Sequence, residues 1–178
     1  MGNIKKSISK CSIRRWNILI FVCVGSRDYQ FDRLIKKIDE LVEEGRITDE
    51  VIAQIGQSTY VPKHIKCSDF LDADMFQKYQ NEADLIISHG GTGALISALK
   101  KGKQVIAVPR YARFGEAATD HQTEISQILT EEGYLRQVLN IDDLGDIIEE
   151  CYINPIQKKY DKPSHILDII IDFIENNS

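Results

Sequence analysis

The chain has 178 residues, of which 43% are hydrophobic and 28% charged, a composition typical of one globular domain with a packed core. A collagen-like, disordered or disulfide-scaffold chain is therefore excluded. The formal net charge is −5, so a nucleic acid is not expected as a partner. Residues 1–16 hold five basic residues and no acidic one, so a basic N-terminal extension precedes an acidic body. The extension is interpreted as either a disordered segment or a membrane-surface helix.

Segments typical of strands and of helices alternate from residue 17 onwards. Apolar runs rich in β-branched residues predict strands over 17–24, 50–55, 65–70, 83–88, 104–108 and 134–139. Apolar residues at helical spacing predict helices over 28–44, 72–82, 94–101, 119–132 and 142–150. Residues 151–163 contain two prolines and several charges and are interpreted as a linker. A last helix is predicted over 164–178, apolar over more than one face.

This alternation predicts an α/β fold over residues 17–150, with a single Rossmann-like, doubly wound parallel sheet. In such sheets ligands bind outside the carboxyl ends of the strands. The turns that follow the strands are therefore the places to look for functional residues.

Cysteines and histidines give no sign of a metal centre. The four cysteines, at positions 11, 23, 67 and 151, form no Cys-x-x-Cys pair and are expected to be reduced thiols of a cytosolic protein. The four histidines form no tight ligand cluster, so no zinc site is expected. No apolar run is long enough to cross a bilayer.

A glycine-rich turn, Ser-His-Gly-Gly-Thr-Gly over residues 88–93, follows one predicted strand and opens a helix. Glycines let a backbone approach a ligand closely, and the N–H groups at a helix N-terminus favour an anion. The turn lacks the Gly-Lys-Ser/Thr of a Walker A loop and the third glycine of a dinucleotide fingerprint. It indicates a phosphate or diphosphate site, and a plain strand–helix turn is the alternative.

A polar cluster follows the next strand. Arg110 and Arg113 are suited to phosphate, an acid to a sugar hydroxyl, and His121 and Gln122 to a base or sugar. A solvated loop followed by a helix with Asp120 in its first turn is an equally good interpretation. The pair Asp72 and Asp74 matches a metal-binding Asp-x-Asp motif, but the predicted helix start favours capping.

Taken together, these motifs resemble the donor-binding half of the GT-B glycosyltransferases of family 28, over residues 18–135. The matching pieces are 20–25, 54–58, 84–93 and 108–122. The resemblance is greatest to single-domain catalytic subunits of two-subunit enzymes. These are bacterial capsular or exopolysaccharide transferases and the eukaryotic dolichol-pathway N-acetylglucosaminyltransferase. The long loop with Phe114 and Glu116 is more similar to the bacterial proteins.

The resemblance implies a UDP-sugar as donor and no metal or other cofactor. The glycine turn would hold the diphosphate, residues 56–58 would lie near the nucleotide, and 120–122 would contact a sugar. Many members carry a ribose-binding acid where this chain has Ser97, and Glu116 is the candidate replacement. The implied donor-binding residues are Gly25, Gly56, Gln57, Ser58, His89, Gly90, Gly91, Thr92, Gly93, Arg110, Glu116, Asp120, His121 and Gln122.

The expected reaction is transfer of a hexose or N-acetylhexosamine from the UDP-sugar to a lipid-linked acceptor. His89 is a candidate catalytic base, with a structural role as the alternative. The resemblance implies that a membrane-anchored subunit binds the acceptor and holds this chain at the cytosolic face of a membrane. The final helix either covers that subunit or packs on its own domain. A non-catalytic accessory protein is the alternative function, and a UDP-sugar 2-epimerase is disfavoured because it needs both domains in one chain.

Overall fold

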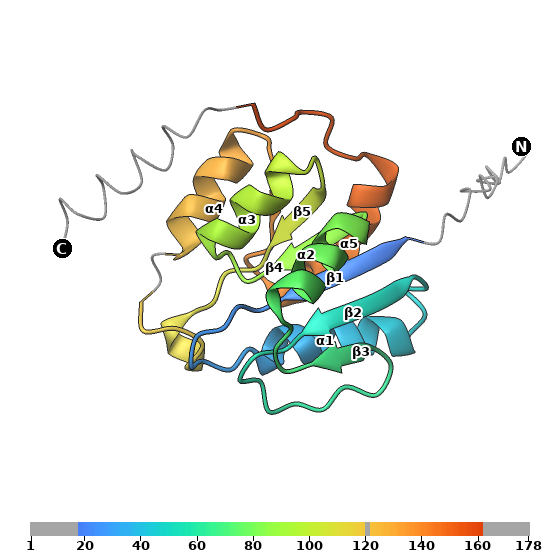
Figure 1. Cartoon of the computed structure of the whole chain (residues 1–178), viewed down its shortest axis with the longest axis vertical. Helices are drawn as coiled ribbons and strands as arrows, with labels where there is room; N and C mark the ends of the chain where they lie inside the picture. The colour runs from blue at the N-terminus through green and yellow to red at the C-terminus, as the bar shows by residue number, and fades with distance from the viewer. Residues whose placement is uncertain (1–17, 120–121, 162–178) are drawn as a thin grey trace, which may run out of the picture.

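The computed structural model describes residues 18–119 and 122–161. Within them, strands form one parallel sheet in the order β3-β2-β1-β4-β5-β6, with α-helices on both faces (Figure 1). The strands are β1 (Leu19–Cys23), β2 (Glu50–Gln54), β3 (Lys66–Ser68), β4 (Leu85–Ser88), β5 (Gln104–Ala107) and β6 (Arg136–Gln137). This arrangement confirms the doubly wound, Rossmann-like sheet expected from the sequence.

The helices divide between the two faces of the sheet. Helices α1 (Asp32–Glu43) and α5 (Leu144–Ile153) pack in one hydrophobic core. Helices α2 (Ala73–Glu82), α3 (Thr92–Lys100) and α4 (Gln122–Glu131) pack on the opposite face. Two short 3-10 turns, η1 (Ala112–Phe114) and η2 (Ile141–Asp143), complete the elements of the described residues.

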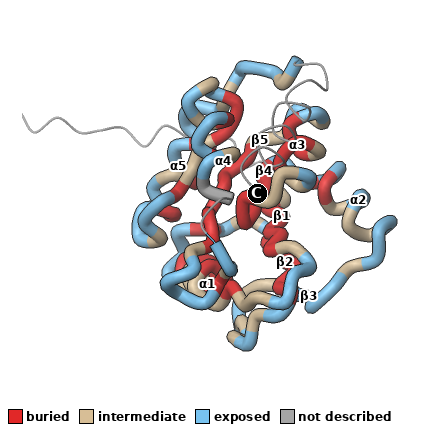
Figure 2. Tube along the Cα trace, turned by 90° about the vertical axis from the view of Figure 1, so that its left-hand side faces the viewer, coloured by how far each residue is buried: buried red, intermediate tan, exposed pale blue. Residues whose placement is uncertain are grey.

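The central position of β1 in the sheet explains why its residues are apolar without alternation. Ile20 and Val22 belong to the core on the α1 side, whereas Phe21 and Cys23 belong to the core on the α3 side. Both faces of a central parallel strand are covered by helices, so every side chain is apolar. Figure 2 shows the resulting buried layer running through β1, β4 and β5.

Several element boundaries differ from the sequence-based prediction. Helix α1 begins at Asp32 and not at residue 28, and α3 begins at Thr92, two residues earlier than expected. Helix α5 continues to Ile153, so the first three residues of the predicted linker are helical, because Cys151 is buried in the core. The predicted N-terminal extension and C-terminal helix lie outside the described residues.

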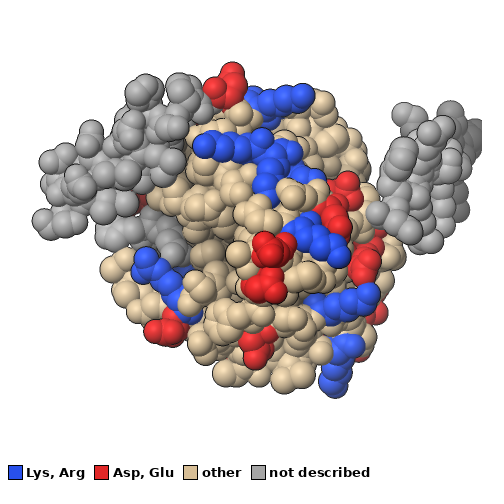
Figure 3. Space-filling view, in the orientation of Figure 1, with Lys and Arg blue, Asp and Glu red and all other residues tan. Residues whose placement is uncertain are grey.

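The three described cysteines are free thiols, as expected, and Cys11 lies outside the described residues. None of the described helices is long and apolar enough to cross a membrane. On the face shown in Figure 3, Lys and Arg are interspersed with Asp and Glu among the described residues, and they form no continuous basic surface there.

Candidate functional site

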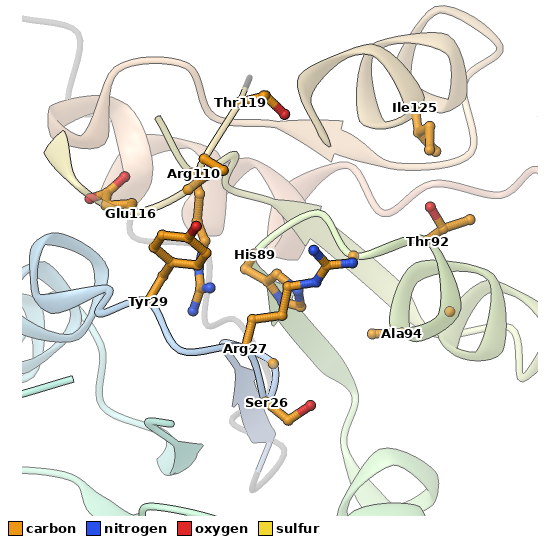
Figure 4. Close-up of a pocket in the computed structure, with 15 residues that line it drawn as sticks. Ser26, Arg27, Tyr29, His89, Thr92, Ala94, Arg110, Glu116, Thr119 and Ile125 are labelled. Atoms are coloured by element: carbon orange, nitrogen blue, oxygen red, sulfur yellow. The ribbon is translucent and has the colours of Figure 1, made fainter. Parts of the chain in front are cut away.

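A pocket of about 560 Å³ lies at the carboxyl ends of the central strands. Chain order along the sheet reverses between β1 and β4. The pocket is lined by the turns after β1, β4 and β5, by the first turn of α3 and by Ile125 of α4 (Figure 4). Its size is within the range of about 300–1,000 Å³ that small-molecule sites occupy. The position is the one at which open α/β sheets bind ligands.

The glycine turn places the N-terminus of α3 at this pocket. His89, Gly91, Thr92 and Gly93 line it, and Gly90 lies between them in the chain. Gly91 is the N-cap residue of α3, and no side chain caps this helix end. The N–H groups of the first helical turn, with the partial positive charge of the helix end, are thus available to an anion.

His89 is buried, and its imidazole packs between Gly25 and Gly91. Its Nδ1 is 3.2 Å from the carbonyl oxygen of Cys23, which can only accept a hydrogen bond, so Nδ1 carries the proton. Burial and the charges of Arg110 and Arg27 lower the pKa of His89 to about 4. The imidazole is therefore neutral at pH 7, with the lone pair on Nε2.

Gly25 and Gly91 are glycines because the imidazole of His89 leaves no room for side chains. A Cβ at Gly91 would lie 2.5 Å from His89 Nε2, and a Cβ at Gly25 would lie 2.7 Å from His89 Cε1. Gly25 also has a φ of +81°, a conformation that disfavours other residues. The turns after β1 and β4 are thus fixed to each other through His89.

Arg110 is a buried cation at the wall of the pocket, with a side chain only 2% exposed. Its Nη2 donates to the carbonyl oxygen of Val24 at 2.6 Å, its guanidinium stacks over the ring of Phe31, and its Nε has no partner among the described residues. Burial lowers the pKa of Arg110 to about 10, so the side chain stays charged at neutral pH.

Glu116 holds the loop after β5 against α1. Its carboxylate accepts from Arg33 Nε and Nη2, both at 2.9 Å, and from the backbone N–H of Tyr111 at 3.1 Å. Both oxygens of this buried acid are therefore engaged. Glu116 lines the pocket, but a ribose hydroxyl would have to share its oxygens with Arg33 and Tyr111.

The turn after β2 contributes no residue to the lining of this pocket. Gly56 packs against Gly25, where a Cβ would come 2.9 Å from the Gly25 carbonyl oxygen, and Gln57 is exposed. Ser58 Oγ accepts from the backbone N–H of Phe31 at 3.0 Å, at the start of α1. The assignment of Gly56, Gln57 and Ser58 to donor binding stays a prediction.

The remaining predicted residues divide into three groups. Asp120 and His121 lie outside the described residues, and Gln122 is the first residue of α4, with its side chain not described. Asp72 caps α2, accepting from the backbone N–H of Met75 at 2.7 Å, which confirms the capping interpretation. Ser97 donates to Gln80 Oε1 at 2.8 Å, so it contacts α2.

Among the pocket residues that were not singled out from the sequence are Arg27 and Tyr29. Arg27 and Tyr29 follow the carboxyl end of β1 and line the pocket. Their place after the first strand was the available signal, since the turn beginning at Gly25 falls on the ligand-binding edge. Arg113, considered for phosphate, does not line this pocket and instead stacks on the rings of Tyr111 and Phe114.

A parallel sheet with an uncapped helix end and a buried arginine at its switch point defines a Rossmann-like domain with an anion-accepting pocket. Residues 19–170 match the model of the glycosyltransferase family 28 C-terminal domain. The chain belongs to this family, and the resemblance inferred from its motifs is confirmed.

Individual relatives agree with this assignment. The chain is 32% identical over 124 residues to UDP-N-acetylglucosamine transferase subunit ALG13 of Mus musculus, covering 65% of this chain and 10% of that relative. It therefore spans about a tenth of the length of that relative. Among solved structures, MurG of Acinetobacter baumannii is similar with a TM-score of 0.56 and 19% identity, over 87% of this chain and 50% of MurG.

The solution structure of ALG13 matches with a TM-score of 0.52 and 17% identity, over 78% of this chain and 87% of that structure. These likenesses in structure show a shared fold. The half-length match to MurG fits the expectation that this chain corresponds to one half of a GT-B enzyme.

Proposed function

We propose that this chain is the donor-binding, catalytic subunit of a two-component glycosyltransferase, which transfers a hexose or N-acetylhexosamine from a UDP-sugar to a lipid-linked acceptor. One observation carries the proposal: the uncapped N-terminus of α3 and the buried guanidinium of Arg110 meet at one pocket of the sheet edge. Family membership supports sugar transfer, and the name of the ALG13 relatives supports a subunit of a larger enzyme.

Sugar transfer from a nucleotide requires that the departing diphosphate be stabilised as negative charge develops on it. Helix N–H groups and a fixed cation do this without rearranging, because they are oriented before the reaction begins. We assign this role to Gly91, Thr92, Gly93 and Arg110, which line the pocket. The carbon left behind in the transition state is expected to have oxocarbenium character.

The acceptor hydroxyl also needs a base, and His89 was the candidate. A base with a pKa of about 4 is weak at neutral pH, because the best catalytic pKa lies near the working pH. We therefore assign His89 to positioning the turns after β1 and β4. The base and the acceptor site are assigned to a membrane-anchored partner subunit, which would hold the chain at the cytosolic face of a membrane.

Binding and transfer assays test the proposal. The full chain is titrated with UDP, and transfer from labelled UDP-sugars is measured with the chain alone and with its partner. Gly93→Ala is the site variant, since Gly93 lines the pocket and a Cβ there meets nothing within 4 Å of the protein. Its methyl group is expected to weaken UDP binding by more than about 10-fold without reducing stability, because it fills space that the diphosphate would occupy.

Gly145→Ala is the matched control. It adds the same methyl group within α5, against the flexible side chain of Arg46, and is expected to leave UDP affinity unchanged. Absence of UDP binding by the wild-type chain, alone and with a partner, would contradict the proposal and favour the accessory function. Full transfer activity of the isolated chain would contradict the two-component arrangement.

A further inference from the structure

Arg27 is an exposed arginine at the pocket whose charge has no counterpart. It lies in the turn after β1, and its guanidinium has no hydrogen bond or ion pair among the described residues. In Figure 4 its side chain extends past His89 toward Thr92, at the N-terminus of α3. It therefore reaches the part of the pocket in which the uncapped helix end lies.

Arg110 is a second cation at the same pocket. Burial is the main cause of the lowered pKa of Arg110 and of His89, and the nearby charge of Arg27 lowers both further. The acid that also lines this wall, Glu116, is held by Arg33 through two hydrogen bonds. Arg27 and Arg110 thus repel each other. The charge of Glu116 offsets this repulsion at Arg110, whereas the Arg27 guanidinium has no carboxylate partner among the described residues.

Such an arrangement is costly when empty and favourable when an anion lies between the two guanidinium groups. Arginine presents several N–H donors in a planar fork that matches phosphate oxygens, and such charge-assisted bonds are about twice as strong as neutral ones. A diphosphate offers one negative phosphoryl group to each arginine. A monophosphate would have to bridge both guanidinium groups with its single phosphoryl group and carries less negative charge.

We propose that Arg27 binds the diphosphate of the donor beside the α3 N-terminus, so that the pocket prefers nucleoside diphosphates to nucleoside monophosphates. This inference rests on the proposed function and adds a substrate-contacting residue to it. It gives the turn after β1 a direct part in donor recognition, alongside its packing against His89.

Calorimetric titration of the full chain with UDP, UMP, uridine and inorganic pyrophosphate tests this role. Arg27→Ala is expected to weaken UDP and pyrophosphate binding by about 10- to 100-fold and to leave uridine binding unchanged. Arg27→Lys keeps the charge without the planar fork and is expected to fall between the wild type and Arg27→Ala. Because Arg27 is exposed and its charge is repelled by that of Arg110, neither substitution should lower the thermal unfolding midpoint of the unliganded chain.

Arg113→Ala is the matched control, since it removes the same charge from an exposed side chain that does not line the pocket. It is expected to change UDP affinity by less than about 2-fold. Equal affinity of wild type and Arg27→Ala for UDP would overturn the role of Arg27 and leave the proposed function intact. A wild type that binds neither UDP nor uridine would instead contradict the proposed function. In that case pyrophosphate binding alone tests the role of Arg27. If the wild type and Arg27→Ala bind pyrophosphate with equal affinity, or if the wild type does not bind it, the role is overturned.

Discussion

Two glycine-containing turns lie at the same edge of the sheet, one after β4 and one after β2. They differ in whether their polar groups are engaged within the protein. The turn after β4 ends in an uncapped helix that faces the pocket. In the turn after β2, Ser58 accepts from the start of α1, and Asp32 of α1 accepts from Thr59 and Tyr60. The first turn leaves donors available, whereas the second uses its polar groups internally. Of these two turns, the one whose backbone donors face the pocket is the one at which strand order reverses.

The largest expected effect is at the wall of the pocket. Glu116→Ala leaves Arg33 and the Tyr111 N–H without their buried acceptor and is expected to lower the free energy of unfolding by about 3 kcal/mol. Urea unfolding at pH 7 measures the change. Glu50→Ala, on β2, breaks an exposed pair with Lys66 and should lower the urea midpoint far less than Glu116→Ala does, because exposed pairs are screened by solvent. Equal losses in the two variants would remove the distinction between the two regions.

The next effect concerns His89 and pH. The pKa of His89 in the folded chain, about 4, lies below its ordinary value of 6.5, so the unfolded chain binds the proton first as pH falls. Stability is therefore retained above pH 6.5 and lost progressively toward pH 4. Between pH 7 and pH 5 this loss is expected to be about 2 kcal/mol.

Comparison with His89→Asn isolates this contribution. The variant retains a side-chain N–H donor for the Cys23 carbonyl but does not titrate, so its unfolding free energy should fall by about 2 kcal/mol less over the same interval. The other histidines are common to both proteins and cancel in the difference. Parallel pH profiles would show that His89 is not held neutral by its surroundings.

The smallest effect is at the turn after β2. Ser58→Ala removes the acceptor for the Phe31 N–H and should cost about 1 kcal/mol of stability. Because Ser58 does not line the pocket, UDP affinity should change by less than about 2-fold. A large loss of UDP affinity with unchanged stability would support the sequence-based assignment of this turn to the nucleotide.

The sequence predicts the sheet well because each central strand is an unbroken apolar run. It predicts the glycine turn because several glycines directly after a strand indicate a tight turn or a close backbone approach. It did not predict that Glu116 pairs with Arg33, 83 positions away in the chain, since such a pairing depends on how the loop after β5 folds over α1. Glu116 was assigned to the ribose because many family members carry an acid where this chain has Ser97, and that assignment stays a prediction. Arg27 was overlooked because one arginine in a turn has no pattern that separates it from a solvated side chain.

The bare N-terminus of α3 has a consequence for folding as well as for binding. A serine, threonine or aspartate at an N-cap typically adds about 1 kcal/mol to helix stability, and Gly91 supplies no such group. Under the proposed function, the phosphate oxygens of the donor take the place of that absent side chain and act as the cap. The nucleotide is then both a substrate and a stabilising part of the fold. The stability of the domain should rise with the logarithm of the donor concentration once that concentration exceeds the dissociation constant.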